Sequence, residues 1–141
     1  MGKIKNFKEI GGPDKPIVVI SRDTSSGTYE TWEGKIMKKE RVTPRAQVMA
    51  SNGAIVQAVS NNKHAIGYIG IGYLNNSVKP LKVNGITGSK TTTLDGTFPI
   101  SRPLFMFTNG WPEGEVMSFM SFILSDDGQQ LVREAKSIPL F

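Results

Sequence analysis

A polar segment at residues 21–30, SRDTSSGTYE, follows the apolar run PIVVI at 16–20 without a spacer. β-Branched residues between a proline and a polar turn predict a short buried strand over 16–21. If a helix begins near residue 28, its first backbone N–H groups have no acceptors within the helix. The helix macrodipole adds about half a positive charge at the same end. The segment is therefore typical of a binding site for a small anion.

Four residues of this segment are the candidate anion ligands, namely Arg22, Ser26, Gly27 and Thr28. The planar guanidinium of Arg22 suits a tetrahedral oxyanion, to which it can donate two parallel hydrogen bonds. The two hydroxyls can also donate, and Gly27 lets an anion approach the backbone because it has no Cβ. Asp23 is placed to orient the guanidinium. The same spacing fits a second interpretation, in which the hydroxyl residues only cap a helix and Arg22 is a solvated surface charge.

Several other chemistries lack the residues that they need. A nucleotide-binding P-loop requires a Gly-Lys-Ser/Thr sequence, which the segment does not contain. The chain has no cysteine and a single histidine, His64, so disulfides and thiolate metal sites are excluded. Ser26 has no histidine or lysine base near it in the sequence, which argues against a serine nucleophile. We therefore predict a protein that is not an enzyme and that uses neither a cofactor nor a metal.

The charge distribution narrows the range of partners. The formal net charge of +5 favours anionic partners in general. The basic residues are spread along the chain rather than gathered on one helix, which argues against nucleic-acid binding. No apolar stretch approaches the ~20 residues of a membrane span, and the first twelve residues have no apolar core of a signal peptide.

Hydrophobic periodicity predicts an alternation of strands and helices along the 141 residues. Besides the strand at 16–21, strand-like segments are expected over 65–74, 78–85 and 98–110. Helices are expected over 28–40, 51–62, 111–124 and 126–136, and a polar loop over 86–97. Glycines in the 65–74 segment are expected to allow close backbone approach. This order indicates an α/β fold with a mostly parallel sheet.

Five further residues are considered for a functional role, namely Arg102, Trp32, Trp111, Asn52 and Gly53. Arg102 is interpreted as a hinge or surface residue rather than a ligand. Trp32 and Trp111 are expected to pack in the core. Asn52 and Gly53 open the second helix, with Ser51 or Asn52 as its N-cap, and could direct N–H groups toward the same cleft as the first helix. Capping alone also explains these two residues.

Five segments, in this order, resemble the later part of the phosphate-binding protein of high-affinity phosphate ABC transporters. They are GKIKNFKEIGG, SRDTSSGTYETWE, NKHAIGYIGIGYL, FPISRPLFMFTNG and FILSDDGQQLVREAKSIPLF. The Arg-x-x-x-Ser-Gly-Thr core is the most specific of them, whereas the last segment is common among class II periplasmic binding proteins. The resemblance implies a class II periplasmic-binding-protein-like α/β fold. It also implies that Arg22, Ser26, Gly27 and Thr28 contact phosphate and that the protein captures phosphate for uptake without catalysis.

The resemblance further implies that residues 1–141 form one α/β binding-protein domain, namely the second lobe with its C-terminal return segment. The N-terminal segment of the first lobe is expected to be absent, and with it an acidic group that excludes sulfate. We then expect weak phosphate binding by this chain. The implied partners are inorganic phosphate, an ABC permease, and either the missing first-lobe segment or a second copy of the chain.

By family analogy, the expected location is the periplasm or, for a membrane-anchored protein, the outer cell surface. The alternative function is an interaction or signalling module that keeps the binding-protein fold without transport.

Overall fold

Three short parallel strands form the sheet of this protein. The computed structural model describes residues 2–141, in which the strands are β1 (Val18–Arg22), β2 (Gln47–Met49) and β3 (Ala65–Ile66). Their order is β2-β1-β3, so β1 is the central strand. β1 pairs with both neighbours in parallel. The carboxyl ends of the strands consequently lie at one edge of the sheet, which is where ligands bind in open α/β folds.

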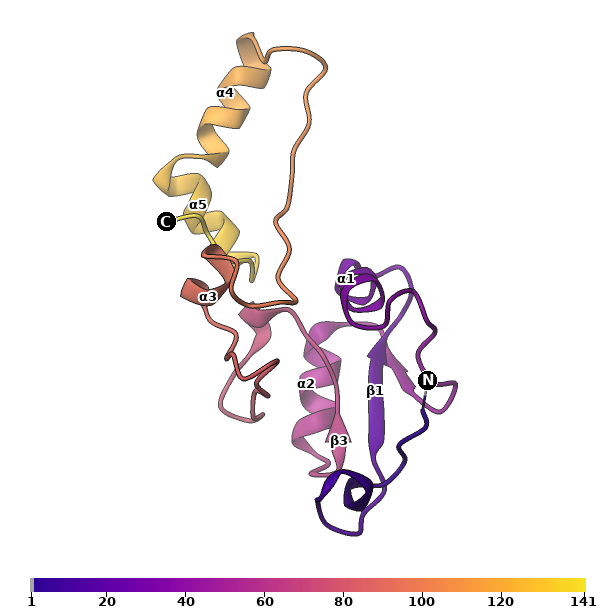
Figure 1. The fold of residues 1–141 in the computed structure, drawn as a ribbon. Coiled ribbons are helices and arrows are strands. Elements are labelled where there is room, and N and C mark those ends of the chain that lie inside the picture. Colours follow the sequence, from indigo (N-terminus) through magenta and orange to yellow (C-terminus); the bar gives the residue numbers. More distant parts are fainter. Residues whose placement is uncertain (1) are drawn as a thin grey trace.

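Helices connect the strands and build the rest of the chain. Within residues 2–141 the five α-helices are α1 (Gly27–Lys35), α2 (Asn52–Ser60), α3 (Lys90–Leu94), α4 (Gly114–Ile123) and α5 (Asp126–Glu134). Two 3₁₀ helices are η1 (Phe7–Ile10) and η2 (Ile71–Tyr73). α1 connects β1 to β2, and α2 then crosses back past β1 to β3 on its other side. Figure 1 shows α1 beyond the carboxyl end of β1, with α2 alongside the sheet.

The apolar core of the described residues lies between α2 and the sheet. Ile20 on β1 and Ile55 on α2 are its two buried hydrophobic residues, with 2% and 1% of their surface exposed. Gly67 follows β3, and a Cβ at that position would lie 2.8 Å from the Cγ2 of Ile55. The predicted close approach of this glycine-rich segment is therefore confirmed at Gly67.

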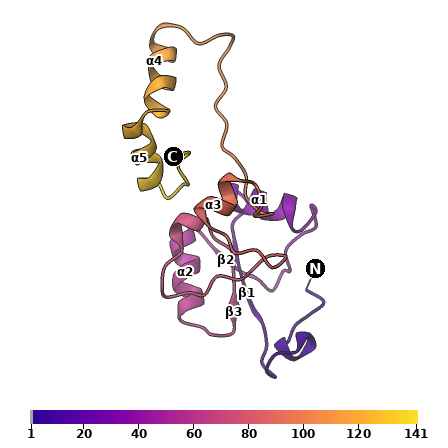
Figure 2. The ribbon, with the colours of Figure 1, turned by 60° about the vertical axis from the view of Figure 1, so that its left-hand side comes forward.

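A C-terminal arm, defined here as residues 103–141, extends away from the sheet. Figures 1 and 2 show an extended segment that rises from the body and α4 and α5 that run back from its far end. α4 has no buried residue. The exposed large apolar side chains of the arm are Leu104, Phe105, Met106, Phe107, Trp111, Val116, Met117, Phe119, Phe122, Leu124, Leu131, Leu140 and Phe141. The expectation that Trp111 packs in the core is wrong, because 83% of its surface is exposed.

The arm returns to the body at its end. Gln129 on α5 is buried, donates from Nε2 to the carbonyl of Ile123 at 2.9 Å and accepts from the backbone N–H of Leu140 at 2.7 Å. Further along, the backbone of Lys136 packs so closely on Gly72 that a Cβ there would lie 2.2 Å from the Lys136 carbonyl oxygen. A side chain at Gly72 would therefore separate the arm from the body.

The first helix is shorter than its sequence pattern predicts. The expected range was 28–40, whereas α1 begins at Gly27 and ends at Lys35, with Ile36 as the C-cap. Lys38 and Lys39 have φ values of 50° and 66°, which no α-helix contains. Gly34 weakens the last turn of the helix. The helix therefore ends at Lys35, before the charged residues 38–41 that the sequence pattern included in part.

The strand predictions beyond β1 are largely wrong. Of 65–74, only Ala65–Ile66 is a strand, and η2 occupies part of the remainder. The segment 78–85 contributes one isolated bridge, between Val83 and Ile86, and 98–110 belongs to no strand. An apolar extended pattern becomes a strand only when a partner strand supplies its backbone hydrogen bonds, and the pattern itself does not identify that partner.

Besides the two 3₁₀ helices, one strand and one α-helix were absent from the sequence predictions. β2 has only three residues, and its burial pattern is mostly exposed, so it carries little hydrophobic signal. α3 forms in the expected polar loop because Ser89 and Thr92 make reciprocal capping hydrogen bonds. Of the two predicted N-caps of the second helix, Ser51 and Asn52, the structure has Ser51, whose Oγ accepts from the Ala54 N–H at 3.1 Å.

Gly67→Ala is expected to lower the free energy of unfolding by about 1–3 kcal/mol, because its methyl group would overlap Ile55 in a packed core. Gly34→Ala is the matched control. No atom lies within 4 Å of a Cβ at Gly34, so this change should stabilise α1 by about 0.5–1 kcal/mol. Urea unfolding of both variants measures the difference. Equal stability of the two variants would contradict the described packing of Gly67, just after β3, on α2.

Candidate functional site

The end of β1 is fixed by an aromatic hydroxyl. The hydroxyls of Ser21 and Tyr68 lie 2.8 Å apart, and the Arg22 N–H donates to the same Tyr68 oxygen at 3.1 Å. The Tyr68 ring stacks on Trp32 of α1, with 4.7 Å between the ring centroids and 4° between the planes. Tyr68 therefore joins the last residues of β1 to the helix that follows, and Trp32 packs against it as an aromatic partner.

The guanidinium of Arg22 extends from this point to the start of α2. Its Nη2 donates to the carbonyl oxygen of Ala50 at 3.2 Å and to a carboxylate oxygen of Asp23 at 3.4 Å. The side chain is 13% exposed. Its Nε is buried and hydrogen-bonds to no group of the described residues. Leaving a buried donor unpaired costs about 1–3 kcal/mol, so this nitrogen is suited to a hydrogen-bond acceptor that the chain itself does not supply.

Asp23 is held in the ionised state by its neighbour in the same turn. Ser25 donates to the Asp23 carboxylate from its hydroxyl, and also from its backbone N–H at 3.1 Å. These bonds, with that of the hydroxyl foremost, lower the pKa of Asp23 below its ordinary value, and the charge of Arg22 acts in the same direction. The expected pairing of Asp23 with Arg22 is confirmed, although the ion pair is long.

The start of α1 is capped by Ser26, one of the four predicted ligands. Its Oγ accepts from the N–H groups of Thr28 and Tyr29 at 3.2 and 3.4 Å, and its own N–H donates to the Asp23 carbonyl at 3.2 Å. Among the described residues, no acceptor receives the Ser26 hydroxyl hydrogen, the Gly27 N–H or the Thr28 hydroxyl. Ser26 therefore caps α1, as the second interpretation expects, and three donors remain at the helix start. The other half of that interpretation is wrong, because the Arg22 side chain is only 13% exposed and is not a solvated surface charge.

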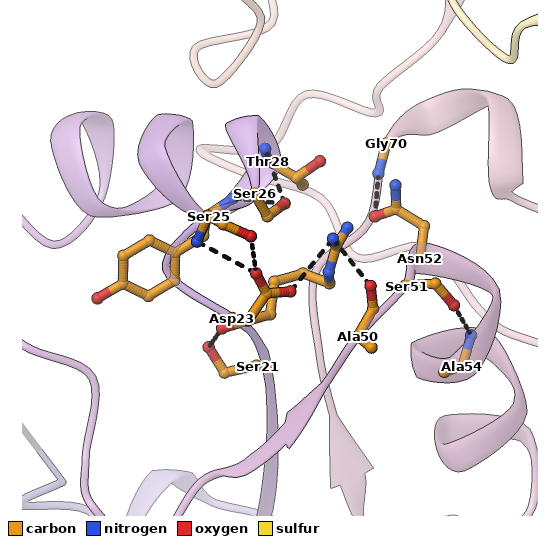
Figure 3. A network of polar contacts seen from close by, with 12 residues as sticks. Ser21, Asp23, Ser25, Ser26, Thr28, Ala50, Ser51, Asn52, Ala54 and Gly70 are labelled. Carbon is orange, nitrogen blue, oxygen red and sulfur yellow. Dashed lines mark hydrogen bonds and ion pairs between the residues drawn. The ribbon is translucent and has the colours of Figure 1, made fainter.

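The start of α2 lies beside the same edge of the sheet. Figure 3 shows Ser26 and Asp23 facing Ala50, Ser51 and Asn52 across the end of β1. Asn52 accepts from the N–H of Gly70 through its side-chain oxygen at 3.3 Å, which ties α2 to the segment after β3. Two helix N-termini, each with a positive dipole end, therefore approach the position of Arg22.

The structure brings Arg22, Ser26, Gly27 and Thr28 together at this edge, as sequence spacing requires. Tyr68 and the Ala50 carbonyl were not among the predicted residues. Tyr68 lies in the glycine-rich segment that was interpreted as a plain strand, and a backbone carbonyl has no sequence signal at all. Two surface depressions, lined by 74–80 and by residues of α2, η2 and Lys136, include none of the four candidates.

Within residues 2–141, no group of three or more His, Asp or Glu residues is arranged to hold a metal ion. No helix in that range is both long enough and apolar enough to cross a membrane.

Comparison with known proteins identifies the family. The PBP superfamily domain matches residues 1–127. The chain therefore belongs to the PBP superfamily. Within it, the sequence is 37% identical to the phosphate-binding protein PstS of Borreliella burgdorferi, over 94% of this chain and 52% of that protein. It is 36% identical to PstS of Staphylococcus aureus strain USA300, over 91% of this chain and 42% of that protein.

Solved structures agree with this assignment. A substrate-binding protein from Clostridium perfringens, assigned to a phosphate ABC transporter and determined with bound phosphate, is 37% identical and superposes with a TM-score of 0.81. The match covers 99% of this chain and 58% of that one. A phosphate transport receptor from Vibrio cholerae is 31% identical and superposes with a TM-score of 0.79. That match covers 94% of this chain and 57% of the receptor. The predicted α/β periplasmic-binding-protein fold and non-enzymatic class are confirmed, and the chain spans about half the length of the curated relatives that it matches.

Ser25→Ala is expected to raise the pKa of Asp23 toward its ordinary value, because the Ser25 hydroxyl is the first cause of its lowering. A carboxyl carbon NMR titration measures this shift. The lowered pKa also implies a stabilising contribution that is complete above the unfolded-state pKa and is lost as the pH falls through the folded-state pKa.

Thr97→Ala is the matched control, since Thr97 lowers the pKa of Asp95 through the same kind of hydrogen bond. It should raise the pKa of Asp95 and leave that of Asp23 in place. An unchanged Asp23 pKa in Ser25→Ala would show that the Ser25 hydroxyl does not hydrogen-bond to the Asp23 carboxylate.

Proposed function

We propose that this chain holds inorganic phosphate between Arg22 and the start of α1, as part of the solute-binding component of a phosphate ABC uptake system. The observation that carries the proposal is the buried Nε of Arg22, which has no acceptor among the described residues. Its position at the carboxyl end of β1, beside two helix N-termini, suits a tetrahedral anion. The relatives named above are phosphate-binding proteins, and one of them was determined with phosphate bound.

The remaining donors would come from the first turn of α1. The Ser26 and Thr28 hydroxyls and the Gly27 N–H are the groups whose hydrogens have no acceptor there. Charge-assisted hydrogen bonds of this kind are about twice as strong as neutral ones. Ser26 accepts two N–H bonds at its Oγ, which polarises its hydroxyl toward donation to an anion. Phosphate would thus complete hydrogen bonding that the chain leaves open.

Capture of phosphate for uptake requires a second surface that closes over the ion. The exposed apolar side chains of the C-terminal arm supply a surface on which a further polypeptide could pack. The matched relative from Borreliella burgdorferi is about twice as long as this chain and so contains such a polypeptide. We infer that this polypeptide corresponds to the first-lobe segment of those relatives and that it completes the site. Phosphate binding by residues 1–141 alone is then weak, with a dissociation constant of about 1 mM or higher. By analogy, the protein works with an ABC permease outside the cytoplasmic membrane.

A phosphate titration followed by amide NMR tests the proposal. The amide signals of Ser26, Gly27 and Thr28 should shift, and those at the start of α5, which begins at Asp126, should not. Amides that stay unchanged up to ~100 mM phosphate would contradict the proposal. That outcome would favour an interaction module that keeps the fold and uses the exposed arm.

Arg22→Gln should weaken phosphate binding about 10- to 100-fold, because it removes a charged donor whose hydrogen bonds are worth about 1.5–3 kcal/mol. Arg133→Gln is the matched control. It removes the same charge from α5, where Arg133 bonds to Gln130. Equal weakening by both variants would show that net charge alone sets the affinity.

Ser26→Ala and Ser125→Ala separate ligand binding from helix capping. Both serines cap nine-residue helices through their Oγ. Each change should therefore cost about 1 kcal/mol of stability, but only Ser26→Ala should also reduce the phosphate-induced shifts. Thermal unfolding and the same NMR titration measure the two effects. A normal phosphate response in Ser26→Ala would remove this hydroxyl from the site.

A further inference from the structure

A second arginine lies at the start of α1, brought there by a distant part of the chain. The Nη1 of Arg102 is 3.1 Å from a carboxylate oxygen of Glu30, which is in the first turn of the helix. Its Nη2 lies only 2.8 Å from the position that a Cβ of Gly27 would occupy. The guanidinium therefore packs directly against the glycine whose N–H is proposed to face phosphate.

This contact gives Gly27 a second reason to lack a side chain. Any other residue at this position would push the Arg102 guanidinium away from the helix start. Arg102 is also anchored on its other side, because Lys35 at the end of α1 donates to the carbonyl of Ser101. The segment at 101–102 is thus attached to both ends of α1, which keeps the Arg102 charge near the same backbone position.

Two ion pairs lie at the start of α1. Arg22 is paired with Asp23 and Arg102 is paired with Glu30, so the four charges sum to zero. Glu30 is 72% exposed and Arg102 is 37% exposed, and an exposed pair of this kind is held by less than about 1 kcal/mol. Arg102 is therefore free to redirect part of its interaction toward a dianion beside Gly27.

We propose that Arg102 is an electrostatic positioning residue of the phosphate site, which attracts the dianion to the start of α1 while Glu30 moderates its charge. The inference rests on the proposed function, because it concerns the same anion. It assigns Arg102 a role in affinity, where the sequence indicated only a hinge or surface position.

The test is an NMR phosphate titration of Arg102→Gln and Glu30→Gln beside the unmodified chain. Arg102→Gln should weaken binding about threefold to tenfold, and Glu30→Gln should strengthen it by a similar factor, because one removes an attractive and the other a repulsive charge. Arg102→Lys should bind within about twofold of the unmodified chain. Arg133→Gln, which lowers the net charge equally, should have no more than a small effect.

The direction of the two changes separates this role from a merely structural one. Both Arg102→Gln and Glu30→Gln break the same ion pair, so a structural contribution of that pair would weaken binding in both variants. Weakening in both, or an unchanged affinity in Arg102→Gln, overturns the inference and leaves the proposed function standing. The absence of any phosphate response in the unmodified chain overturns the proposed function and this inference together. Amide spectra of each variant without phosphate establish that it is folded.

Discussion

The arrangement at the edge of the sheet depends on how one cation, 13% exposed and with a buried Nε, is accommodated. Arg22 ends the central strand, and its guanidinium contacts the Ala50 carbonyl, which leads into α2, and the Asp23 carboxylate, which leads into α1. Burying a guanidinium is costly unless its donors are paired. Two contacts at 3.2 and 3.4 Å satisfy it incompletely, and the Nε remains without a partner among the described residues. The two helix starts, the Ser26 cap and the Tyr68 hydroxyl are all arranged around this residue.

The local structure around Arg22 follows its sequence pattern more closely than the sheet does. The four candidates lie within seven residues, so local chemistry alone brings them together: a strand, a polar turn and a capped helix follow one another. Tyr68, Ala50 and Arg102 reach the same place through tertiary contacts, from positions 28 to 80 residues distant from Arg22 along the chain. No local pattern carries that information. The strand predictions were wrong for a related reason. The extended run at 98–110 satisfies the strand pattern but has no neighbouring strand to pair with.

The C-terminal arm carries most of the exposed large apolar side chains of the described residues. Its helices have the apolar stripes of packed helices, yet α4 buries no residue within the described chain. The solved relative from Clostridium perfringens superposes closely on this chain, which covers 58% of that relative. The body holds the end of the arm through the close contact between Gly72 and Lys136. Apolar surface of this extent marks a site of protein contact.

The most direct measurement of the central claim follows the Nε–H of Arg22 itself. In a nitrogen-edited NMR spectrum of the arginine side chains, addition of phosphate should shift the Arg22 Nε–H signal and slow the exchange of its proton with water, because the ion becomes the acceptor that this buried nitrogen lacks. Sulfate and chloride at equal ionic strength serve as comparisons. An Arg22 Nε–H signal that keeps its position and exchange rate while other signals respond to phosphate would place the anion elsewhere and contradict the account.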